Sequence, residues 1–198
     1  MYELPSHYRY ATPEDAIDLA QLINIAGEGL PLYLWTQMVE GSLDPFELGR
    51  QRAMRDSGSF SFRNAVVREH EGQVVACLIG YPLPDAPAQT DYSDMPPMFV
   101  PLQQLEDLAP GTWYLNVLAT YPEFQGRGYG SELLNLTRGL SMETGKSGVS
   151  IIVSDANPGA RRLYERFGCK EVARRPMVKE SWVNPGREWV LLVETSSR

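Results

Sequence analysis

Apolar residues at helical spacing mark the first predicted helix of the chain. Ala16, Leu19, Ala20 and Ile23 follow the i, i+3, i+4, i+7 spacing that places residues on one face of a helix. Thr12-Pro13 precedes them and is typical of a helix start, with Thr12 as N-cap. Similar patterns predict helices near 44–56, 131–142 and 157–167, and the large apolar residues of 30–35 form either a second helix or part of a substrate pocket.

Continuous or alternating apolar runs predict six to seven strands, at 8–11, 65–68, 73–81, 112–120, 149–154, 169–174 and 188–193. The short polar link His70-Glu71-Gly72 is typical of a hairpin. The nearly continuous apolar character of 112–120 favours a central strand. The order of elements is mixed α/β, with a strand-helix-strand-helix unit at its centre.

Proline changes this pattern between residues 82 and 110. The stretch holds seven of the fifteen prolines, which exclude central strands and helix interiors. Aromatic residues such as Tyr92 and Phe99 favour an ordered loop over a flexible linker. Because the chain has 198 residues and no internal repeat, we expect a single domain, 1–198, that carries this proline-rich insert at 82–110.

Composition argues against several classes of protein. The net charge of −7 disfavours a nucleic-acid binder, and no apolar run approaches the length of about 20 residues that a membrane span requires. His7 and His70 are isolated, and Cys77 and Cys169 are expected to be buried thiols, so we predict neither a metal site nor a histidine-based triad. The N-terminus lacks the layout of a signal peptide, and the cytoplasm is the expected compartment.

The stretch Gln125-Gly126-Arg127-Gly128-Tyr129-Gly130 separates a predicted strand from a predicted helix. Glycine lets the backbone approach a ligand closely, and unpaired N–H groups at a helix N-terminus attract anions. The stretch lacks the Gly-Lys-Ser/Thr of a nucleotide-triphosphate loop, and Ser131 stands where a dinucleotide fingerprint needs its third glycine. The sequence therefore predicts a phosphate cradle of another type.

The spacing Gln125-x-x-Gly128-x-Gly130 resembles the acetyl-CoA pyrophosphate loop of the GCN5-related N-acetyltransferase (GNAT) family. Leu118-Ala119 before Tyr121-Pro122-Glu123 is similar to that family's entry into the loop, and 157–168 is similar to its second cofactor segment. The resemblance is specific over 114–169, looser over 11–81 and absent from the insert. It implies the α/β GNAT (acyl-CoA N-acyltransferase) fold, with a mixed central sheet of six to seven strands that splays at the middle and about four flanking helices.

The resemblance also implies acetyl-CoA as the acetyl donor and coenzyme A as a product. The backbone of Val117, Leu118 and Ala119 would pair with the pantetheine arm and polarise the thioester carbonyl. Seven consecutive residues would hold the pyrophosphate through their backbone: Gln125, Gly126, Arg127, Gly128, Tyr129, Gly130 and Ser131. Asn157 matches a position that contacts the cofactor, and it can also act as a helix cap.

Three residues are candidates for the chemistry. Tyr164 matches the family's general acid, which donates a proton to the departing thiolate, although it is also placed as a core aromatic of an amphipathic helix. Many relatives carry a glutamate on the central strand near Asn116, and an amide at this position can only position a water. Glu28, in Gly27-Glu28-Gly29, is a candidate base, with Asp91, Asp94 and a water chain as alternatives.

Two stretches without Lys or Arg, 11–49 and 82–110, carry seven and five acidic residues and map to the substrate side of the family. With nearby aromatic residues they predict an amine acceptor that is a small cationic or partly apolar molecule, with a peptide amine as the alternative. The resemblance implies neither a nucleic-acid nor a membrane partner, and relatives are often homodimers. A non-catalytic acyl-CoA-binding or sensing module on the same fold is the alternative function, and a nucleotide-dependent phosphotransferase is a third.

Overall fold

The computed structural model of the chain describes residues 2–87 and 89–195. The chain folds into two compact units. The N-terminal unit comprises Glu3–Tyr81 and Asn116–Leu136, and the C-terminal unit comprises Tyr2, Pro82–Leu115 and the chain from Thr137 onward. The predicted organisation as a single domain, 1–198, stays a prediction.

A seven-stranded mixed sheet forms the framework, in the order β1-β2-β3-β4-β5-β7-β6. Its strands are β1 (Tyr8–Tyr10), β2 (Ala65–His70), β3 (Gln73–Pro82), β4 (Trp113–Thr120), β5 (Gly148–Ser154), β6 (Lys170–Pro176) and β7 (Glu188–Thr195). β4 pairs in parallel with β5 over Trp113–Leu115, whereas the β1–β2, β2–β3, β5–β7 and β6–β7 pairs are antiparallel. The predicted mixed sheet of six to seven strands is confirmed, and its splay at the middle stays a prediction.

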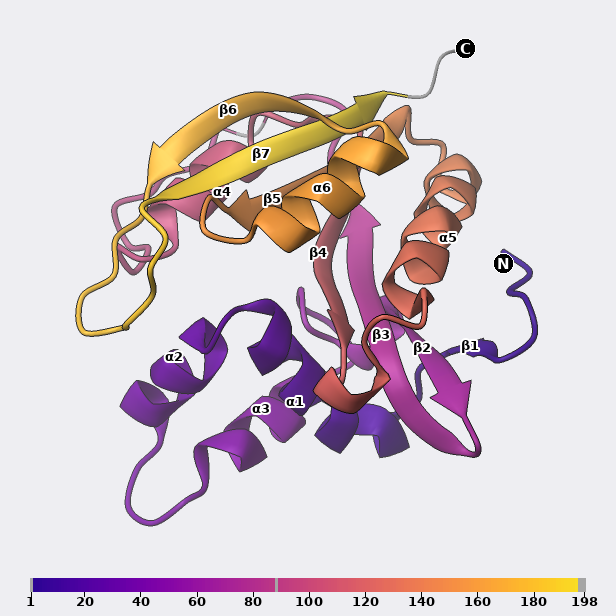
Figure 1. Cartoon of the computed structure of the whole chain (residues 1–198). Helices are drawn as coiled ribbons and strands as arrows, with labels where there is room; N and C mark the ends of the chain where they lie inside the picture. Colours follow the sequence, from indigo (N-terminus) through magenta and orange to yellow (C-terminus); the bar gives the residue numbers. More distant parts are fainter. Residues whose placement is uncertain (1, 88, 196–198) are drawn as a thin grey trace. The chain divides into compact units, whose positions relative to one another are not determined.

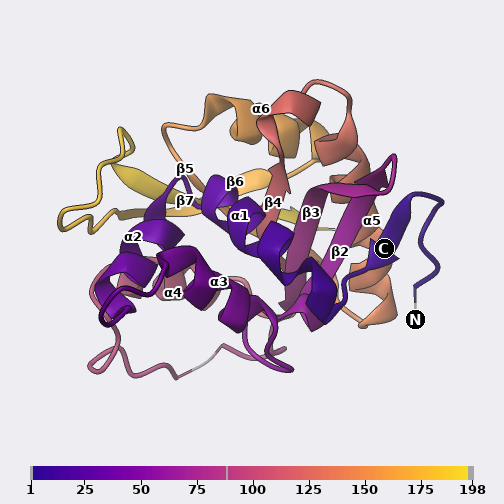
Figure 2. The same ribbon diagram turned by 90° about the horizontal axis from the view of Figure 1, so that it is seen from below.

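Three helices belong to the N-terminal unit: α1 (Ala16–Ala26), α2 (Leu30–Met38) and α3 (Pro45–Ala53). The three pack against one another, and Figure 2 shows α1 and α3 side by side. Buried Leu19 and Ile23 of α1 and Trp35 of α2 join Val67 and Ile79 of the sheet in one hydrophobic core. The apolar run 30–35 is therefore part of a helix, and Trp35 within it is a core residue.

The C-terminal unit contains α4 (Val100–Glu106), α6 (Pro158–Phe167) and β5 to β7. The strands β6 and β7 form a long hairpin beside β5 (Figure 1), and α4 packs on all three strands. Within this unit, Trp182 stacks on Trp189 with ring centroids 6.0 Å apart. Cys169 is buried here and Cys77 is buried in the N-terminal unit, and both are free thiols, as predicted.

The helix boundaries differ from the predicted ones in instructive ways. The proline-rich insert contains α4, which the sequence reasoning missed because Pro101 stands in the first turn, where proline costs nothing. The helix after the glycine loop, α5 (Tyr129–Glu143), begins two residues earlier than predicted. Gly139 within it faces the ring of Tyr2, since a Cβ there would collide with that ring. A close approach of a side chain, and not packing on the sheet, therefore accounts for this glycine.

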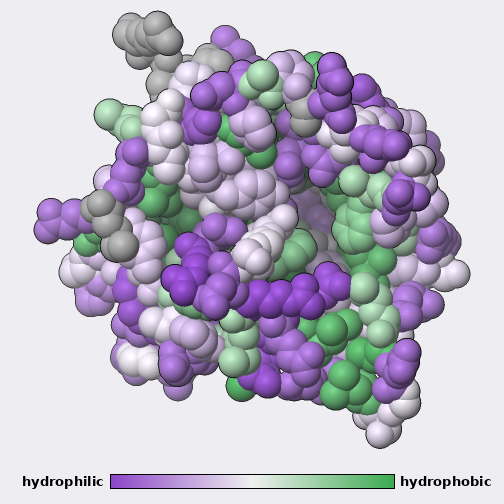
Figure 3. Space-filling view, turned by 180° about the vertical axis from the view of Figure 1, so that it is seen from behind, coloured by the Kyte–Doolittle hydropathy of each residue, from purple (hydrophilic) through white to green (hydrophobic). Residues whose placement is uncertain are grey.

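Hydrophobic residues also reach the surface. The side chains of Val183 and Met142 are 92% and 76% exposed. The face in Figure 3 carries hydrophilic and hydrophobic residues intermixed. Scattered exposure of this kind is normal for globular proteins.

Candidate functional site

The glycine loop lies between a short 3-10 turn, Pro122–Phe124, and the first residue of α5 in the N-terminal unit. Gly126 and Gly128 have φ angles of 76° and 88°. Residues with a Cβ adopt this left-handed conformation at a cost, so the backbone path itself requires glycine. A Cβ on Gly126 would meet nothing within 4 Å, and one on Gly128 would lie 3.9 Å from Glu132 Oε1. The loop therefore presents bare backbone on an open side.

Side chains of the loop fix its shape. The Gln125 side-chain amide donates to the Thr120 carbonyl at 3.2 Å, which ties the loop to the end of β4. The Arg127 guanidinium lies 5.2 Å from the centroid of the Phe124 ring, within range of a cation–π contact. The predicted role of Gln125 was through its backbone, and its side chain has this separate structural partner.

The start of α5 supplies donors toward the loop. The Glu132 N–H donates to the Gly128 carbonyl at 3.0 Å, as an ordinary helical bond. The N–H groups of Tyr129, Gly130 and Ser131 precede this bond, and groups at these positions have no acceptor within a helix. Together with the partial positive charge of the helix N-terminus, this arrangement suits a phosphate or another anion.

The part of β4 in the N-terminal unit leads into the loop. Val117 and Ala119 are buried in the core shared with α1, whereas Asn116 and Leu118 are half-buried. Successive residues of a strand point to opposite faces, so Asn116 and Leu118 lie on the face away from this core. The predicted pairing of this backbone with pantetheine stays a prediction.

Glu28 lies in the tight turn between α1 and α2. Its φ angle is 53°, and Gly29 follows with 85°. The Glu28 N–H donates to the Ile25 carbonyl at 3.2 Å, and the Leu32 N–H donates to Asn24 Oδ1 at 3.0 Å. A glutamate in this backbone conformation costs on the order of 1 kcal/mol relative to glycine. The structure thus keeps an acidic residue where glycine would be the unstrained choice.

The alternative bases lie in the proline-rich insert. Asp91 and Asp94 are exposed residues of the C-terminal unit. The Ser93 N–H donates to Asp91 Oδ1 at 2.9 Å, and hydrogen bonding from Ser93 lowers the pKa of Asp91. A lowered pKa makes a carboxylate a weaker proton acceptor, which disfavours Asp91 as a base.

Asn157 is the N-cap of α6 and Tyr164 lies within that helix, in the C-terminal unit. Asn157 Oδ1 accepts a hydrogen bond from the Ala160 N–H at 3.0 Å, so its predicted capping role is confirmed. Tyr164 is 7% exposed. Burial, and secondarily the neighbouring Cys169, raise the pKa of the Tyr164 hydroxyl. The hydroxyl is therefore protonated throughout the neutral range, as a proton donor must be.

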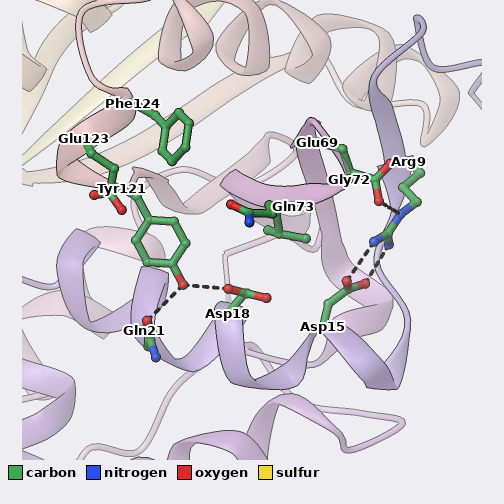
Figure 4. Close-up of a pocket in the computed structure, with 11 residues that line it drawn as sticks. Arg9, Asp15, Asp18, Gln21, Glu69, Gly72, Gln73, Tyr121, Glu123 and Phe124 are labelled. Carbon is green, nitrogen blue, oxygen red and sulfur yellow. Dashed lines mark hydrogen bonds and ion pairs between the residues drawn. The ribbon is translucent and has the colours of Figure 1, made fainter.

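Figure 4 shows a polar pocket of about 490 Å³ in the N-terminal unit, which the sequence reasoning did not find. On one side, the Arg9 guanidinium donates two hydrogen bonds to the Asp15 carboxylate, at 2.7 and 2.8 Å. It donates a third to the Glu69 carboxylate at 2.8 Å. On the other side, the Tyr121 hydroxyl donates to Asp18 at 2.8 Å. These acids already have partners in the protein, so the pocket has a structural explanation.

A cluster of four residues supports the first turn of α5: Tyr8, Arg68, His70 and Glu132. Sequence reasoning missed it because the residues are distant in the chain and fit no motif.

Within residues 2–87 and 89–195, His, Cys, Asp and Glu side chains form no group of three that could bind a metal ion. Every helix in the same ranges is too short or too polar to cross a bilayer.

Comparison with known proteins places the chain in a family. Residues 32–169 match the Acetyltransferase (GNAT) family. The matched range includes β4, the glycine loop, α5 and α6. The chain belongs to the GNAT acetyltransferase family, which implies acyl-CoA-dependent acyl transfer and amine acceptors in general. No curated protein sequence matches this chain.

Solved structures of similar fold extend over nearly the whole chain. One, described as an acetyltransferase, has a TM-score of 0.67 at 22% identity and covers 97% of this chain and 100% of its own. An N-acetyltransferase from Staphylococcus aureus Mu50 has 0.63 at 18% identity, with 94% and 99% covered. A mosquito arylalkylamine N-acetyltransferase-like protein, 5b, has 0.65 at 14% identity, with 95% and 98% covered. These similarities confirm the predicted GNAT fold, and residues 2–87 and 89–195 form six α-helices, approximately consistent with the expected number of about four.

Proposed function

We propose that this protein is an acetyl-CoA-dependent N-acetyltransferase that transfers an acetyl group directly to an amine. The observation that carries the proposal is the loop in which Gly126 and Gly128 adopt left-handed backbone conformations immediately before the N-terminus of α5. Such a loop presents backbone donors and partial positive charge to an anion, and the diphosphate of coenzyme A is an anion of suitable chemistry.

The donor is proposed to bind through backbone groups. The loop from Gln125 to Ser131 holds the diphosphate, and the backbone of Val117, Leu118 and Ala119 pairs with the pantetheine arm. A backbone N–H in β4 then polarises the thioester oxygen as negative charge develops on it. Preorganised donors of this kind are a large catalytic contribution, because they need no reorganisation during the reaction. Asn157 caps α6 and is proposed to contact the cofactor as well.

In the chemical step, the nitrogen of a neutral amine attacks the thioester carbonyl carbon. A C–N bond forms, the carbonyl oxygen takes up negative charge, and the C–S bond breaks as the carbonyl reforms. We propose that Tyr164 donates its hydroxyl proton to the departing thiolate, which leaves as the thiol of coenzyme A. The buried hydroxyl carries its proton at neutral pH, as this role requires, and its raised pKa makes it a weaker acid than an exposed tyrosine.

The amine must lose a proton before it attacks, because an ordinary alkylamine is protonated at neutral pH. Asn116 cannot accept that proton, and we propose that its amide positions a water. Glu28 is the proposed acceptor. Its carboxylate is held by a strained turn, and strained residues cluster at functional sites. A Glu28→Gln variant should therefore lose turnover at neutral pH and regain part of it at higher pH, where more of the amine is neutral.

The acceptor is proposed to be a small cationic amine with some apolar surface. Residues 11–49 contain seven acids and no Lys or Arg, and they form α1, α2 and most of α3. Such a surface attracts cations and repels anions. The mosquito protein of similar fold is named for arylalkylamines, which combine an amine with an apolar ring and agree with this acceptor class.

Two measurements test the proposal. Calorimetry with acetyl-CoA should give saturable binding, and a thiol-release assay over amines, amino acids and peptides should give turnover with at least one cationic acceptor. Binding of acetyl-CoA without turnover on any acceptor would instead favour a non-catalytic acyl-CoA-binding module, which the absence of a glutamate at Asn116 makes a specific alternative. Binding of ATP in place of acetyl-CoA would overturn the proposal.

A further inference from the structure

Arg68 in β2 is a largely buried cation that packs against the first turn of α5. Its side chain is 11% exposed. The guanidinium carbon lies 4.5 Å from the centroid of the Tyr129 ring and 5.3 Å from that of Tyr8, within range of cation–π contacts. Tyr129 is the first residue of α5 and part of the glycine loop. Arg68 is therefore packed against the element that we propose to bind diphosphate.

The pairing of the backbone beside Arg68 is irregular. The pairing of β2 with β3 shifts register between Arg68 and Glu69, and the shift leaves Val75 as an extra residue on β3. Bulges of this kind redirect side chains and recur beside functional sites. Arg68 Nε is buried and has no hydrogen-bond partner within the described part of the chain, which is costly for a charged group. Arg68 Nη1 donates to the Glu69 carbonyl, but that bond gives no reason to bury the charged Nε without an acceptor.

Glu132 gives that reason. Its Oε1 atom lies 3.9 Å from the place that a Cβ on Gly128 would occupy, so its negative charge stands beside the loop. Its Oε2 atom lies 4.0 Å from Arg68 Nε and accepts a hydrogen bond from the Tyr8 hydroxyl. An uncompensated carboxylate here would repel a bound diphosphate. Arg68 is the cation that faces this carboxylate.

We propose that Arg68 is a positioning residue of the diphosphate loop, acting through Tyr129 and Glu132. It holds the first turn of α5 through the Tyr129 ring, and its charge offsets that of Glu132, so the backbone donors of the loop remain available to an anion. Tyr8 holds Glu132 in place by its hydrogen bond. The inference rests on the proposed function, because it presumes that the loop binds the diphosphate of coenzyme A.

The test is a double-mutant cycle on the full chain, with coenzyme A as the titrant in calorimetry. Arg68→Met should raise the Kd by about tenfold, because it leaves Glu132 unopposed. Glu132→Gln should lower the Kd several-fold. The double variant should return to within about threefold of the unaltered protein, since both charges are then absent. Arg63→Gln is the matched control, because Arg63 is an exposed cation just before β2 whose side chain is 59% exposed.

Several outcomes would overturn the inference. The first is an unchanged Kd of Arg68→Met for coenzyme A. The second is a double variant that binds coenzyme A as weakly as Arg68→Met alone, and the third is a raised Kd of Glu132→Gln. If circular dichroism shows that Arg68→Met does not fold, Glu132→Gln decides alone. Failure of the unaltered protein to bind coenzyme A would overturn the proposed function itself, whereas binding by that protein with equal Kd in all variants would overturn this inference only. Once an acceptor is known, Arg68→Met should raise KM for acetyl-CoA and leave kcat nearly unchanged.

Discussion

At the scale of single residues, Gly128 and Gly41 share a backbone conformation but not a location. Their φ angles are 88° and 68°, and a Cβ on Gly41 would meet nothing within 4 Å. Replacing either glycine by a residue with a Cβ therefore has a similar conformational cost. Gly128 lies in the proposed diphosphate loop, whereas Gly41 lies between α2 and α3.

We predict that Gly128→Val abolishes measurable binding of acetyl-CoA in calorimetry. A branched side chain would intrude where the backbone must meet phosphate, and it disfavours the left-handed conformation. Gly41→Val is the control, with a comparable strain of about 1–2 kcal/mol and unaltered affinity. Retained affinity in Gly128→Val would contradict the assignment of the loop.

We predict that Tyr164→Phe lowers kcat about tenfold to a hundredfold and changes the Kd for acetyl-CoA less than twofold. The variant keeps the buried ring and removes the proton donor. Because the pKa of Tyr164 is raised, activity of the unaltered protein should show no loss from ionisation of this group up to pH 9. Tyr92→Phe, which removes a hydroxyl bonded to Asp107 at 2.7 Å, is the control. Unchanged turnover in Tyr164→Phe would remove the proposed acid.

Residue roles were predictable where a local pattern carries them. The capping role of Asn157 was predictable because Asn followed by Pro is typical of an N-cap and the first helical position. The contacts of Arg9 with Glu69 and of Arg68 with Glu132 were not predictable, since the partners lie more than fifty residues apart in the chain. Nothing in local spacing connects such residues.

At the scale of elements, an ion pair anchors the start of α1. Arg9 of β1 contacts Asp15, whose side chain is 7% exposed. Burial alone would raise the pKa of Asp15, but hydrogen bonds from Arg9 and from the Thr12 N–H outweigh it, and the net pKa is lowered. A lowered pKa means that this contact stabilises the fold above the unfolded pKa and is lost as the pH falls through the folded one.

We predict that Asp15→Asn lowers the free energy of unfolding by about 1–2 kcal/mol at pH 7. The difference from the unaltered protein should begin to shrink below about pH 4, where Asp15 of the unfolded chain takes up a proton, and should vanish once the pH passes below the lowered pKa of folded Asp15. Urea unfolding at several pH values measures this. Glu14→Gln, one residue away and exposed, should leave the midpoint nearly unchanged. A difference that is constant with pH would contradict the linkage.

The packing of α2 on α3 depends on a missing side chain. A Cβ on Gly49 of α3 would lie 2.6 Å from atoms of the Trp35 ring, which is buried. Helix propensity alone favours alanine over glycine by about 1 kcal/mol. Overpacking of a buried contact costs about 1–3 kcal/mol and opposes this gain.

We therefore predict that Gly49→Ala is destabilising, with a free energy of unfolding lower by up to about 2 kcal/mol. Gln51→Ala, an exposed position of the same helix, should be neutral or slightly stabilising. Thermal unfolding of the two variants and the unaltered protein under the same conditions measures this difference in stability. A stabilised Gly49→Ala protein would show that α2 and α3 separate readily enough to admit the methyl group.

At the scale of the whole molecule, charge is the property that bears on the acceptor. The net charge is −7, and its acids gather in stretches that lack Lys and Arg. A panel of amines at equal concentration should show turnover that favours cationic over anionic acceptors. The KM for a cationic acceptor should rise as salt is increased from about 0.05 to 0.5 M, because salt screens the attraction. Turnover confined to neutral or anionic acceptors would contradict the proposed acceptor class.

The sequence by itself determined the order of the strands and of most helices, the glycine loop and the family resemblance, because each depends on residues that are close in the chain. Spacing of apolar residues, caps such as Asn157 and the φ angles that only glycine adopts readily are local properties. Tertiary structure alone decided which distant residues support the loop. Arg68, Tyr8 and Glu132 meet because β1, β2 and the start of α5 come together, and contacts across sixty or more residues follow from strand pairing and burial.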